Sequence, residues 1–388
     1  MAKLGDFMRI KHGFAFKGDY ITAEDNEIVL VTPGNFEIGG GFKEKKCKFF
    51  SGDYPKDYVL HADDLIVTMT DLSKQGDTLG YSACVPNSNR IYLHNQRIGL
   101  VDVFNPNADK DYLYWFMRTP QYQKKIVATA SGSTVKHTSP SRICDVEINL
   151  PSIDKQKKIA SLLTSIEKKI HISERINDNL EQQAAALFSS LYNRSNTEVR
   201  YTDLIQILGG GTPKTGETAY WNGNIAFFTP KDVGTPYTFI TEKTITEEGL
   251  SHCNSRLYPV NTVFVTARGT VGKVGLSGVP MAMNQSCYAL VGKETHQLLV
   301  YFYTLKAVDR LKHKASGAVF DAITTRDFDS EQIMKLSDDD AKAFLCVAEP
   351  MFQEILNNSI ENLRLSTLRD FLLPKLMSGE IDVSSVQL

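Results

Sequence analysis

The stretch DKQKKIASLLTSIEKKIHISERINDNLEQQAAALFSSLY, residues 154–192, decides the fold of this 388-residue chain. It contains neither proline nor glycine, so no residue in it breaks a helix. Its seam positions alternate at spacings of four and three, the a/d pattern of a coiled coil, over more than four heptads. They are Ile159, Leu163, Ile166, Ile170, Ser173, Asn177, Leu180, Ala184, Leu187 and Leu191. One helix cannot bury such a stripe alone, so the stretch predicts a partner helix.

Residues 338–377 offer that partner. They carry a poorer seam with the same spacing, and Pro350 is expected to kink the helix. The seam positions are Phe344, Ala348, Met351, Ile355, Asn358, Asn362, Leu365, Arg369 and Leu372. Polar residues at seam positions fix register at a cost in stability. We therefore expect the helices to pack antiparallel and to cross near Ser173 and Asn177 of the first helix and Asn358 and Asn362 of the second.

The sequence ahead of each long helix is a copy of the other. Four phrases recur in the same order, about half a chain apart, which chance similarity between short strand-turn phrases does not readily give. The pairs are VLVTPGNF (29–36) with AFFTPKDV (226–233), DDLIVT (63–68) with NTVFVT (261–266), HNQRIGLV (94–101) with MNQSCYALV (283–291), and SGSTVKHTSPSRICDVEINLP (131–151) with SGAVFDAITTRDFDSEQIMKLS (316–337).

Each half begins with short alternating segments that predict strands broken by Gly, Pro and Asn turns. A short helix is then expected, over 109–130 in the first half and 296–316 in the second, before the long helix. The prediction is an α/β (α+β) fold with an internal pseudo-twofold repeat. It has two similar, twisted, mostly β heads with short helices, separated by two long helices packed as an antiparallel coiled coil. Two similar heads at a fixed separation suit a target with two separated half-sites.

The composition is that of a soluble globular protein, with 42% hydrophobic and 23% charged residues. No apolar run is long enough for a membrane span, and the start of the chain lacks the apolar core of a signal peptide. The six cysteines form no C-x-x-C pair, which indicates reduced, buried thiols in a cytoplasmic protein. The net charge is −2, so any nucleic-acid binding must rest on local clusters or on partner subunits.

Motifs for catalysis and metal binding are missing. The glycine-rich stretch GGGTPKTGETAYWNG, residues 209–223, suggests a phosphate cradle but does not fit G-x-x-x-x-G-K-[ST], and neither does ARGTVGKVG, residues 267–275. We find no metal-spaced histidine cluster, no nucleophile elbow and no amino-methyltransferase tetrapeptide. The sequence therefore predicts no catalytic residue, no metal site and no cofactor in this chain.

Polar side chains that can hydrogen-bond bases lie beside the expected strand ends. Arginine and lysine read guanine, and asparagine and glutamine read adenine. Each could equally be a turn former or a solvated surface residue, but as a set they predict a DNA-reading face on each head. The candidates are Thr32, Asn35, Thr68, Thr70, Lys74, Gln75, His94, Asn95, Gln96, Arg97 and Lys136 in the first half, and Thr229, Lys231, Asp232, Arg268, Thr270, Lys273, Asn284 and Gln285 in the second.

Three parts of the chain resemble the DNA-specificity subunit of type I restriction-modification systems, and the resemblance runs nearly end to end. They are the second-head phrases at 209–233, 245–250 and 263–291, the helix phrase at 150–192, and NLRLSTLRDFLLPKLMSGEI at 362–381. By this resemblance residues 209–223 form a loop of the second head rather than a phosphate cradle.

The resemblance implies five segments. They are target recognition domain 1 (1–151), a central conserved long helix for spacing and methyltransferase docking (152–195), target recognition domain 2 (196–336), a distal conserved long helix (337–383) and a tail (384–388). The expected coiled-coil contacts are Ile159, Leu163, Ile166, Ile170, Asn177, Leu180, Leu187, Met351, Ile355, Asn362, Leu365 and Leu372.

The resemblance also implies a role in host defence. The chain would bind double-stranded DNA at a bipartite, asymmetric target and recruit two methyltransferase subunits, which modify adenine, and restriction subunits. S-adenosylmethionine, ATP and magnesium would belong to those partners. Thr68-Met69-Thr70 stands where the second head has Thr266-Ala267-Arg268, so the half-sites should differ. A self-sufficient DNA enzyme and a DNA-binding regulator without restriction partners remain alternatives.

Overall fold

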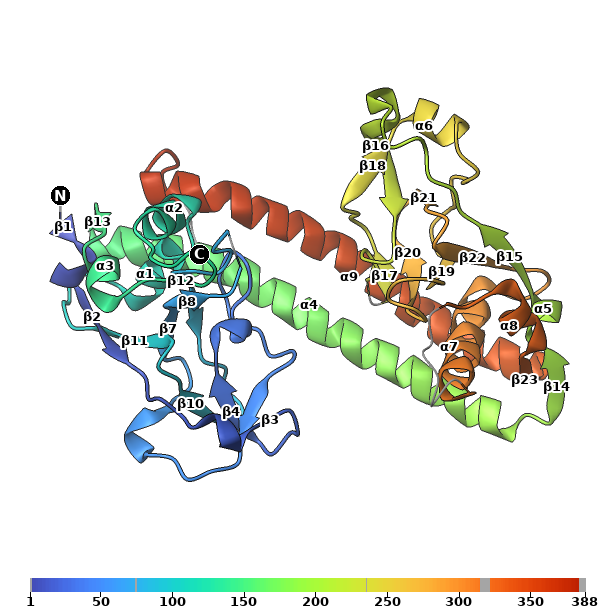
Figure 1. Ribbon diagram of the computed structural model, residues 1–388, viewed down its shortest axis with the longest axis horizontal. Coiled ribbons are helices and arrows are strands. Elements are labelled where there is room, and N and C mark those ends of the chain that lie inside the picture. Colours follow the sequence, from blue (N-terminus) through green and yellow to red (C-terminus); the bar gives the residue numbers. More distant parts are fainter. Residues whose placement is uncertain (1, 74, 235, 315–321, 384–388) are drawn as a thin grey trace. The chain divides into compact units, whose positions relative to one another are not determined.

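The structure is a computed structural model that describes residues 2–73, 75–234, 236–314 and 322–383. The chain divides into two compact units (Figure 1). The first unit is Met1–Ile170 with Arg364–Leu388, and the second is His171–Leu363. Each unit therefore contains one head and parts of both long helices.

The first head is built from short strands and short helices. Its strands are β1 (Ala2–Lys3), β2 (Met8–His12), β3 (Ile21–Thr22), β4 (Ile28–Val31), β5 (Lys48–Phe50), β6 (Val59–Leu60), β7 (Leu65–Thr68), β8 (Thr70–Asp71), β9 (Ser82–Cys84), β10 (Ile91–His94), β11 (Ile98–Val103), β12 (Lys136–His137) and β13 (Glu147–Ile148). Its helices are the 3-10 turns η1 (Leu4–Asp6), η2 (Gly18–Tyr20), η3 (Pro33–Asn35) and η4 (Lys56–Tyr58), and α1 (Lys110–Phe116), α2 (Pro120–Ala128) and α3 (Pro140–Cys144).

The first head contains two main sheets, β3-β5-β4-β10-β6 and β2-β11-β7-β9. β10 runs parallel to β4, in the register Tyr92 to Val29, and the other pairs of these sheets are antiparallel. The single helix expected over 109–130 is instead two helices. Thr119 accepts a hydrogen bond from the Tyr122 amide and caps α2, and Pro120, which lacks an N–H group, occupies its first turn.

The second head follows the same plan. Its strands are β14 (Thr197–Arg200), β15 (Ile205–Gly209), β16 (Trp221–Phe228), β17 (Tyr237–Thr238), β18 (Lys243–Ile245), β19 (Val263–Thr266), β20 (Val274–Ser277), β21 (Met281–Met283), β22 (Cys287–Gly292) and β23 (Gln332–Lys335). Its helices are α5 (Tyr201–Leu204), η5 (Thr218–Tyr220), α6 (Glu247–Ser251), α7 (Gln297–Lys314) and α8 (Thr325–Ser330). The sheets are β15-β22-β19-β20-β17 and β18-β16-β21.

Two long helices complete the fold, α4 (Ile153–Arg194) and α9 (Asp338–Ser378), and α9 continues through Pro350. In the first unit, Ile159 and Leu163 of α4 share a core with Leu373 of α9. In the second unit, Phe188 of α4 lies 5.4 Å, ring to ring, from Phe344 of α9. The start of α4 thus lies beside the end of α9, and the reverse holds in the other unit, so the helices are antiparallel. The predicted fold class is confirmed.

The seam positions of both helices are buried or half-buried. Ile159, Leu163, Ile166, Ile170, Asn177 and Ile355 are buried, and Leu180, Leu187, Met351, Asn362, Leu365 and Leu372 are half-buried. Sequence reasoning missed Phe188 and Phe352, which are 1% and 3% exposed. Both rings contact Phe302 of α7, at 5.0 Å and 5.5 Å, because the second head packs on these faces as well.

Asparagines meet across the helices near the middle of the seam. The Asn358 side chain donates to Asn177 Oδ1 at 2.9 Å, and Asn177 Nδ2 donates to Ser359 Oγ at 3.4 Å. Asn177 is 9% exposed, so these bonds satisfy polar groups that water scarcely reaches. A shift of register would separate them and leave amides unsatisfied in an apolar seam.

Candidate nucleic-acid interface

Three loops of the second head are bound to one another by hydrogen bonds. The first loop follows β16, where the Thr229 amide and hydroxyl both donate to Asp232 Oδ2, at 2.7 Å and 2.6 Å. Asp232 Oδ1 accepts from the Glu242 amide at 2.8 Å. The Asp232 carboxylate is thus engaged within the protein, while Lys231 is exposed with its Nζ 3.5 Å from a Glu242 oxygen.

The second loop follows β19 and turns tightly. The Thr266 hydroxyl donates to the Thr270 carbonyl and accepts from the Lys273 amide at 2.9 Å. The Thr270 hydroxyl donates to the Pro230 carbonyl at 3.0 Å, which joins this loop to the first. Gly269 and Gly272 have φ angles of +82° and +73°, which side-chain-bearing residues rarely adopt. The turn leaves Arg268, Thr270 and Lys273 exposed.

The third loop lies between β21 and β22. Asn284 Oδ1 accepts from the Ser286 amide at 3.0 Å, and the Ser286 carbonyl accepts from the Ala267 amide at 2.8 Å. Gln285 is exposed and accepts from the Thr212 hydroxyl. The exposed candidates of the three loops are named the second reading face. They are Lys231, Arg268, Thr270, Lys273 and Gln285.

The first head repeats part of this frame. The Thr32 amide donates to Asn35 Oδ1 at 2.9 Å, as Thr229 does to Asp232. The Met69 amide donates to the Arg97 carbonyl at 2.9 Å, as Ala267 does to Ser286. The Thr68 hydroxyl donates to the carbonyl two residues on, Thr70, at 2.9 Å, whereas Thr266 donates to the carbonyl four residues on. Asn95 Oδ1 accepts from the Arg97 amide at 3.0 Å, as Asn284 does from Ser286. The repeat seen in the sequence is therefore a repeat of loop geometry.

Many candidates of the first head serve this frame and are buried. Exposed fractions are 1% for Asn35, 0% for Thr68, 4% for Thr70, 1% for His94 and 9% for Asn95. His94 Nε2 lies 2.8 Å from the Ile98 carbonyl, and burial lowers the pKa of His94. As the loops stand, these side chains are buried, and their hydrogen bonds hold the exposed residues in place.

The remaining candidates of the first head are more accessible. Gln75, Gln96 and Arg97 are exposed, and Lys136 and Thr32 are half-buried. Gln75, Gln96, Arg97 and Lys136 are named the first reading face. Lys74 lies outside the described residues. Which of these side chains contact DNA stays a prediction.

Sequence reasoning missed the hydrogen bonds of Asp71, which stabilise the loop between β8 and β9 of the first head. The Asp71 side chain accepts from the Ser73 amide at 2.6 Å and from the Thr78 hydroxyl at 2.7 Å. The Gly80 amide donates to the Thr68 carbonyl, whereas in the second head the Gly272 amide donates to the Thr266 carbonyl. The loop closed by this hydrogen bond is therefore longer in the first head. The Asp-x-Ser pattern at residues 71–73 is typical of an Asx turn, and it is the sequence signal that could have predicted these hydrogen bonds.

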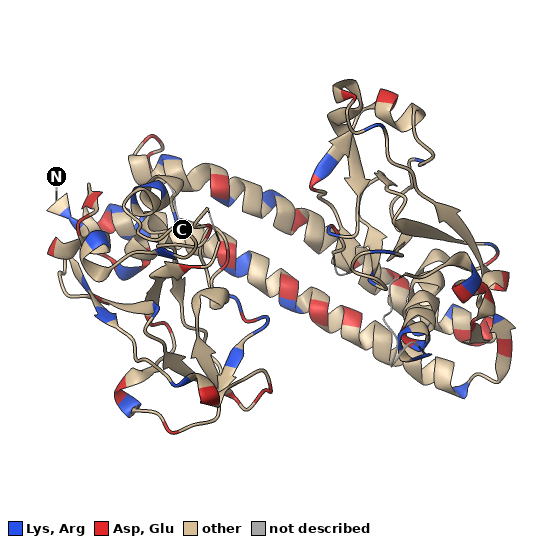
Figure 2. Ribbon diagram, in the orientation of Figure 1, with Lys and Arg blue, Asp and Glu red and all other residues tan. Residues whose placement is uncertain are grey.

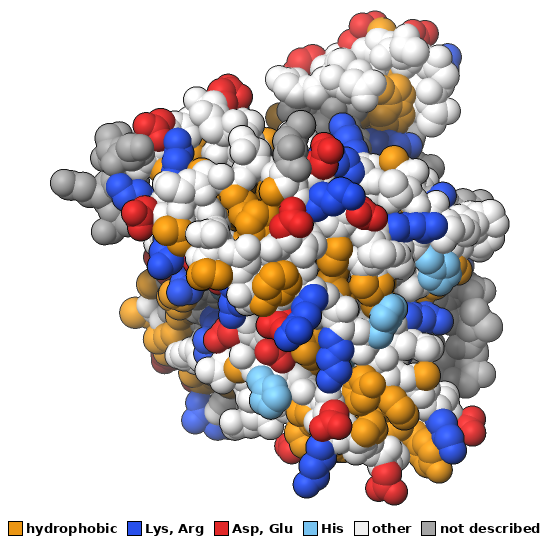
Figure 3. Space-filling model, turned by 90° about the vertical axis from the view of Figure 1, so that its left-hand side faces the viewer, with side chains coloured by type: hydrophobic (Ala, Val, Ile, Leu, Met, Phe, Trp, Pro, Cys, Tyr) orange, Lys and Arg blue, Asp and Glu red, His pale blue; other side chains and the backbone are white. Residues whose placement is uncertain are grey.

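The surface mixes charges of both signs. Lys and Arg alternate with Asp and Glu along both long helices (Figure 2). On the face shown in Figure 3, basic, acidic and apolar side chains are likewise intermingled.

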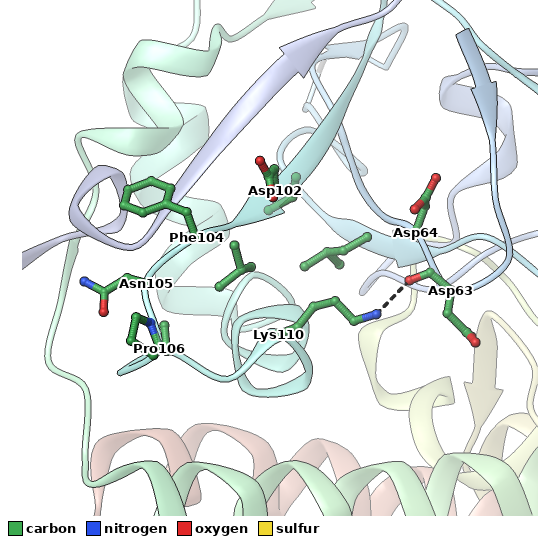
Figure 4. A pocket seen from close by; sticks show the side chains of 11 residues that line it. Asp63, Asp64, Asp102, Phe104, Asn105, Pro106 and Lys110 are labelled. Carbon is green, nitrogen blue, oxygen red and sulfur yellow. Dashed lines mark hydrogen bonds between the residues drawn. The ribbon is translucent and has the colours of Figure 1, made fainter. Parts of the chain in front are cut away.

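A cavity of about 390 Å³ lies on the first head, away from the candidate residues. Asp63, Asp64 and Asp102 line it, and Lys110 points toward the Asp63 carbonyl, to which its Nζ donates at 3.0 Å (Figure 4). Its three carboxylates disfavour an anionic ligand such as a DNA phosphate. In the described part of the chain, no group of three or more His, Cys, Asp or Glu is placed to hold a metal ion. None of the helices described combines the length and apolar character that crossing a bilayer requires.

These features define a duplicated α/β protein with one loop frame in each head and two antiparallel long helices. The chain belongs to the type I restriction modification DNA specificity domain family, whose model matches residues 1–182 and 193–335. The resemblance of the sequence to this family is thereby confirmed.

Relatives and solved structures agree with the family. The chain is 24% identical to the type I restriction enzyme HindI specificity subunit of Haemophilus influenzae, over 85% of this chain and 93% of that one. It is 32% identical to the MjaIX specificity subunit of Methanocaldococcus jannaschii over 30% of this chain and 29% of that one. The type I restriction-modification S subunit of M. genitalium has the same fold, with a TM-score of 0.62, 15% identity and coverage of 96% and 94%.

Proposed function

We propose that this chain is the DNA specificity subunit of a type I restriction-modification complex and reads a bipartite, asymmetric target. One observation carries the proposal: the loops of both heads share corresponding hydrogen bonds but present different side chains. Arg268 stands in the second head where the first has Thr70, and Arg97 stands in the first where the second has Ser286. A shared frame with different exposed groups suits two half-sites of different sequence.

The chemistry of the reading faces supports base recognition in a groove. Arg97 and Arg268 can each donate two parallel hydrogen bonds to guanine, and Gln96 and Gln285 can each donate one hydrogen bond to adenine and accept one from it. Lysines such as Lys231 and Lys273 would position the chain on phosphates without reading sequence. With a net charge of −2, the isolated chain would bind DNA weakly at physiological salt, so partner subunits would supply further phosphate contacts.

The long helices would space the heads and recruit the other subunits. α4 has 42 residues, which at about 1.5 Å per residue is a rod of roughly 60 Å. Its side chains Ile172 and Ile176 are 58% and 45% exposed, and Phe371 of α9 is 56% exposed. Exposed apolar groups on a helix are typical of a protein-docking surface. We infer that methyltransferase subunits bind the helices.

In this proposal the chain itself catalyses no reaction. Two methyltransferase subunits would carry S-adenosylmethionine and modify adenine, and restriction subunits would use ATP and magnesium. The names of the relatives, which are specificity subunits of type I restriction enzymes, support this division of labour.

The test is genome-wide mapping of adenine methylation in the host with and without this gene. Deletion should abolish methylation at one bipartite motif and leave other motifs unchanged, and the motif would give both half-sites and the spacer. Unchanged methylation, in a host whose neighbouring methyltransferase gene is transcribed, would refute the proposal and favour a DNA-binding regulator. Methylation of the motif by the purified chain alone would refute the non-catalytic role.

A further inference from the structure

Backbone hydrogen bonds hold Phe14 against the loop between β10 and β11 of the first head. Its amide donates to the His94 carbonyl at 2.8 Å, and its carbonyl accepts from the Gln96 amide at 2.9 Å. Phe14 and Asn95 form an isolated parallel β-bridge. Phe14 is thus placed directly beside Gln96 and Arg97 of the first reading face, although it is not a polar residue at a strand end. Its side chain is 40% exposed.

The ring of Phe14 packs against other aromatic rings. The Phe14 ring lies 5.2 Å from Phe16 and 5.3 Å from Tyr58, and Phe16 packs on Phe50 at 5.0 Å. Lys11 Nζ lies over the Tyr58 ring at 4.9 Å. Contacts of this kind restrict the orientation of a ring, so part of the Phe14 ring is packed on its neighbours while the rest stays exposed.

The second head has no side chain at the equivalent position. A Cβ added to Gly13 would lie 2.1 Å from the Asn95 carbonyl oxygen, and a Cβ on Gly210 would lie 2.1 Å from that of Asn284, so the two glycines correspond. The next residue is Phe14 in the first head and Gly211 in the second.

Gly211 shares the backbone contact but has no space for a side chain. Its amide donates to the Met283 carbonyl at 3.1 Å, as Phe14 does to His94. A Cβ on Gly211 would lie only 2.5 Å from the Asn254 nitrogen. The two heads thus share the backbone geometry here and differ by an entire aromatic ring.

We propose that Phe14 is a specificity-determining residue for the first half-site, where its ring packs on a thymine methyl group in the DNA groove. Exposed arginine and glutamine beside it would fix the register, and the ring would add an apolar contact that the second half-site lacks. Phenylalanine contacts to thymine methyl groups need no unstacking of the duplex. This inference rests on the proposed function.

The test compares Phe14→Ala with Tyr20→Ala in the complex with the methyltransferase subunits. Tyr20 is an apt control because its ring is 46% exposed and packs on Phe50 at 5.9 Å, while its backbone carbonyl accepts from Ser51 rather than from the reading loop. Binding is measured on three duplexes built from the motif found in the host: the intact target, one with the first half-site scrambled and one with the second scrambled.

Phe14→Ala should weaken binding to the intact target by about tenfold, the effect of losing one apolar base contact. The loss should persist when the second half-site is scrambled and vanish when the first is scrambled, and Tyr20→Ala should stay within about twofold. Phe14→Leu, which keeps an apolar side chain at the same position, should show a smaller loss with the same dependence on the first half-site. It serves as the folded variant if Phe14→Ala unfolds.

Three results would overturn the inference. They are equal losses on all three duplexes, a loss matched by Tyr20→Ala, and loss of methyltransferase from the Phe14→Ala complex in size-exclusion chromatography, which would make the ring a protein contact. If the wild-type complex itself fails to distinguish the intact from the scrambled targets, the proposed function fails and the inference fails with it. A specific wild type with an unaffected Phe14→Ala refutes only the role of Phe14.

Discussion

Each head contacts α4 through a hydrogen bond from a tyrosine hydroxyl to a glutamate of the helix. The surroundings of the two glutamates shift their pKa values in opposite directions. In the first unit, Glu167 accepts from Arg118 Nη1 at 2.6 Å and from the Tyr114 hydroxyl at 2.8 Å. In the second, Glu181 accepts from the Tyr301 hydroxyl at 3.2 Å. Burial acts to raise the pKa of Glu167, but Arg118, Tyr114 and Arg369 together outweigh it and the pKa is lowered. Burial raises the pKa of Glu181, and Asp178 adds to the rise.

This difference shows that a duplicated architecture can keep a contact while changing what the contact contributes. The Arg118 side chain is 4% exposed and also donates to the Gly39 carbonyl at 2.9 Å. It therefore connects the loop at Gly39 of the first head with Glu167 of α4. A buried ion pair of this kind holds one arrangement of its groups but tolerates no loss of a partner. The Tyr301–Glu181 contact should tolerate change.

The largest expected effect comes from removing the carboxylate of the first unit. Glu167→Ala leaves the Arg118 guanidinium buried without its counterion and should lower the free energy of unfolding by about 3–5 kcal/mol. Urea denaturation followed by circular dichroism measures it, since the shift of the midpoint at constant slope reports stability. A loss below about 1 kcal/mol, the range of an exposed ion pair, would contradict the buried-pair interpretation.

The next effect separates the two reading faces. Arg268→Ala should weaken binding of the assembled complex to the second half-site by about 1–3 kcal/mol if the guanidinium contacts a base. Arg97→Ala should do the same for the first half-site, so the two variants are controls for each other. Competition binding with single-base variants of each half-site measures both. Equal losses at both half-sites for either variant would contradict the assignment of one half-site to each head.

Much of the fold can be predicted from the sequence because the elements that determine it have periodic or repeated sequence patterns. The spacing of Ile159, Leu163 and Ile166 predicts a seam, and the repeated phrases predict two heads. A periodic pattern does not identify every contact of a helix, however. Phe188 lies one position off the seam, and only the structure shows that it packs on Phe302 of α7. The division of 109–130 at Pro120 was signalled by proline itself but not recognised.

The site was less predictable for a physical reason. Polar residues at strand ends either face solvent or satisfy nearby backbone groups, and sequence alone does not distinguish the two. Asn35 and Thr68 turn inward to bond the backbone of their own loops, whereas Gln96 and Arg97 are exposed. Phe14 carries no polar atom, so a search for hydrogen-bonding side chains passes over it. The pairing of Gly13 with Gly210 becomes visible only from their close approach to Asn95 and Asn284.

A smaller effect is expected at the polar part of the seam. Replacing Asn177 and Asn358 together by leucine should raise the melting temperature by a few degrees, because it exchanges a buried hydrogen bond for apolar contact. It should also loosen the register of the helices. Disulfide trapping of cysteines introduced one heptad apart on α9, against one cysteine on α4, measures the register. A single trapped register in the leucine variant would contradict the register role, and Ser173→Leu alone controls for added volume.

The smallest effect tests the second junction. Because the folded-state pKa of Glu181 is raised, the ionised carboxylate weakens the fold above that pKa, and wild-type stability recovers as the pH falls through it. Glu181→Gln, which can still accept from Tyr301, should therefore raise the melting temperature by about one or two degrees at pH 7. The gain should shrink as the pH falls through that pKa and the wild-type carboxylate takes up its proton. Glu167→Gln is the matched control and should be destabilising at pH 7, since the pKa of Glu167 is lowered and its charge stabilises the fold. If both glutamine variants changed stability in the same direction, the two junctions would not differ in electrostatics as their contacts indicate.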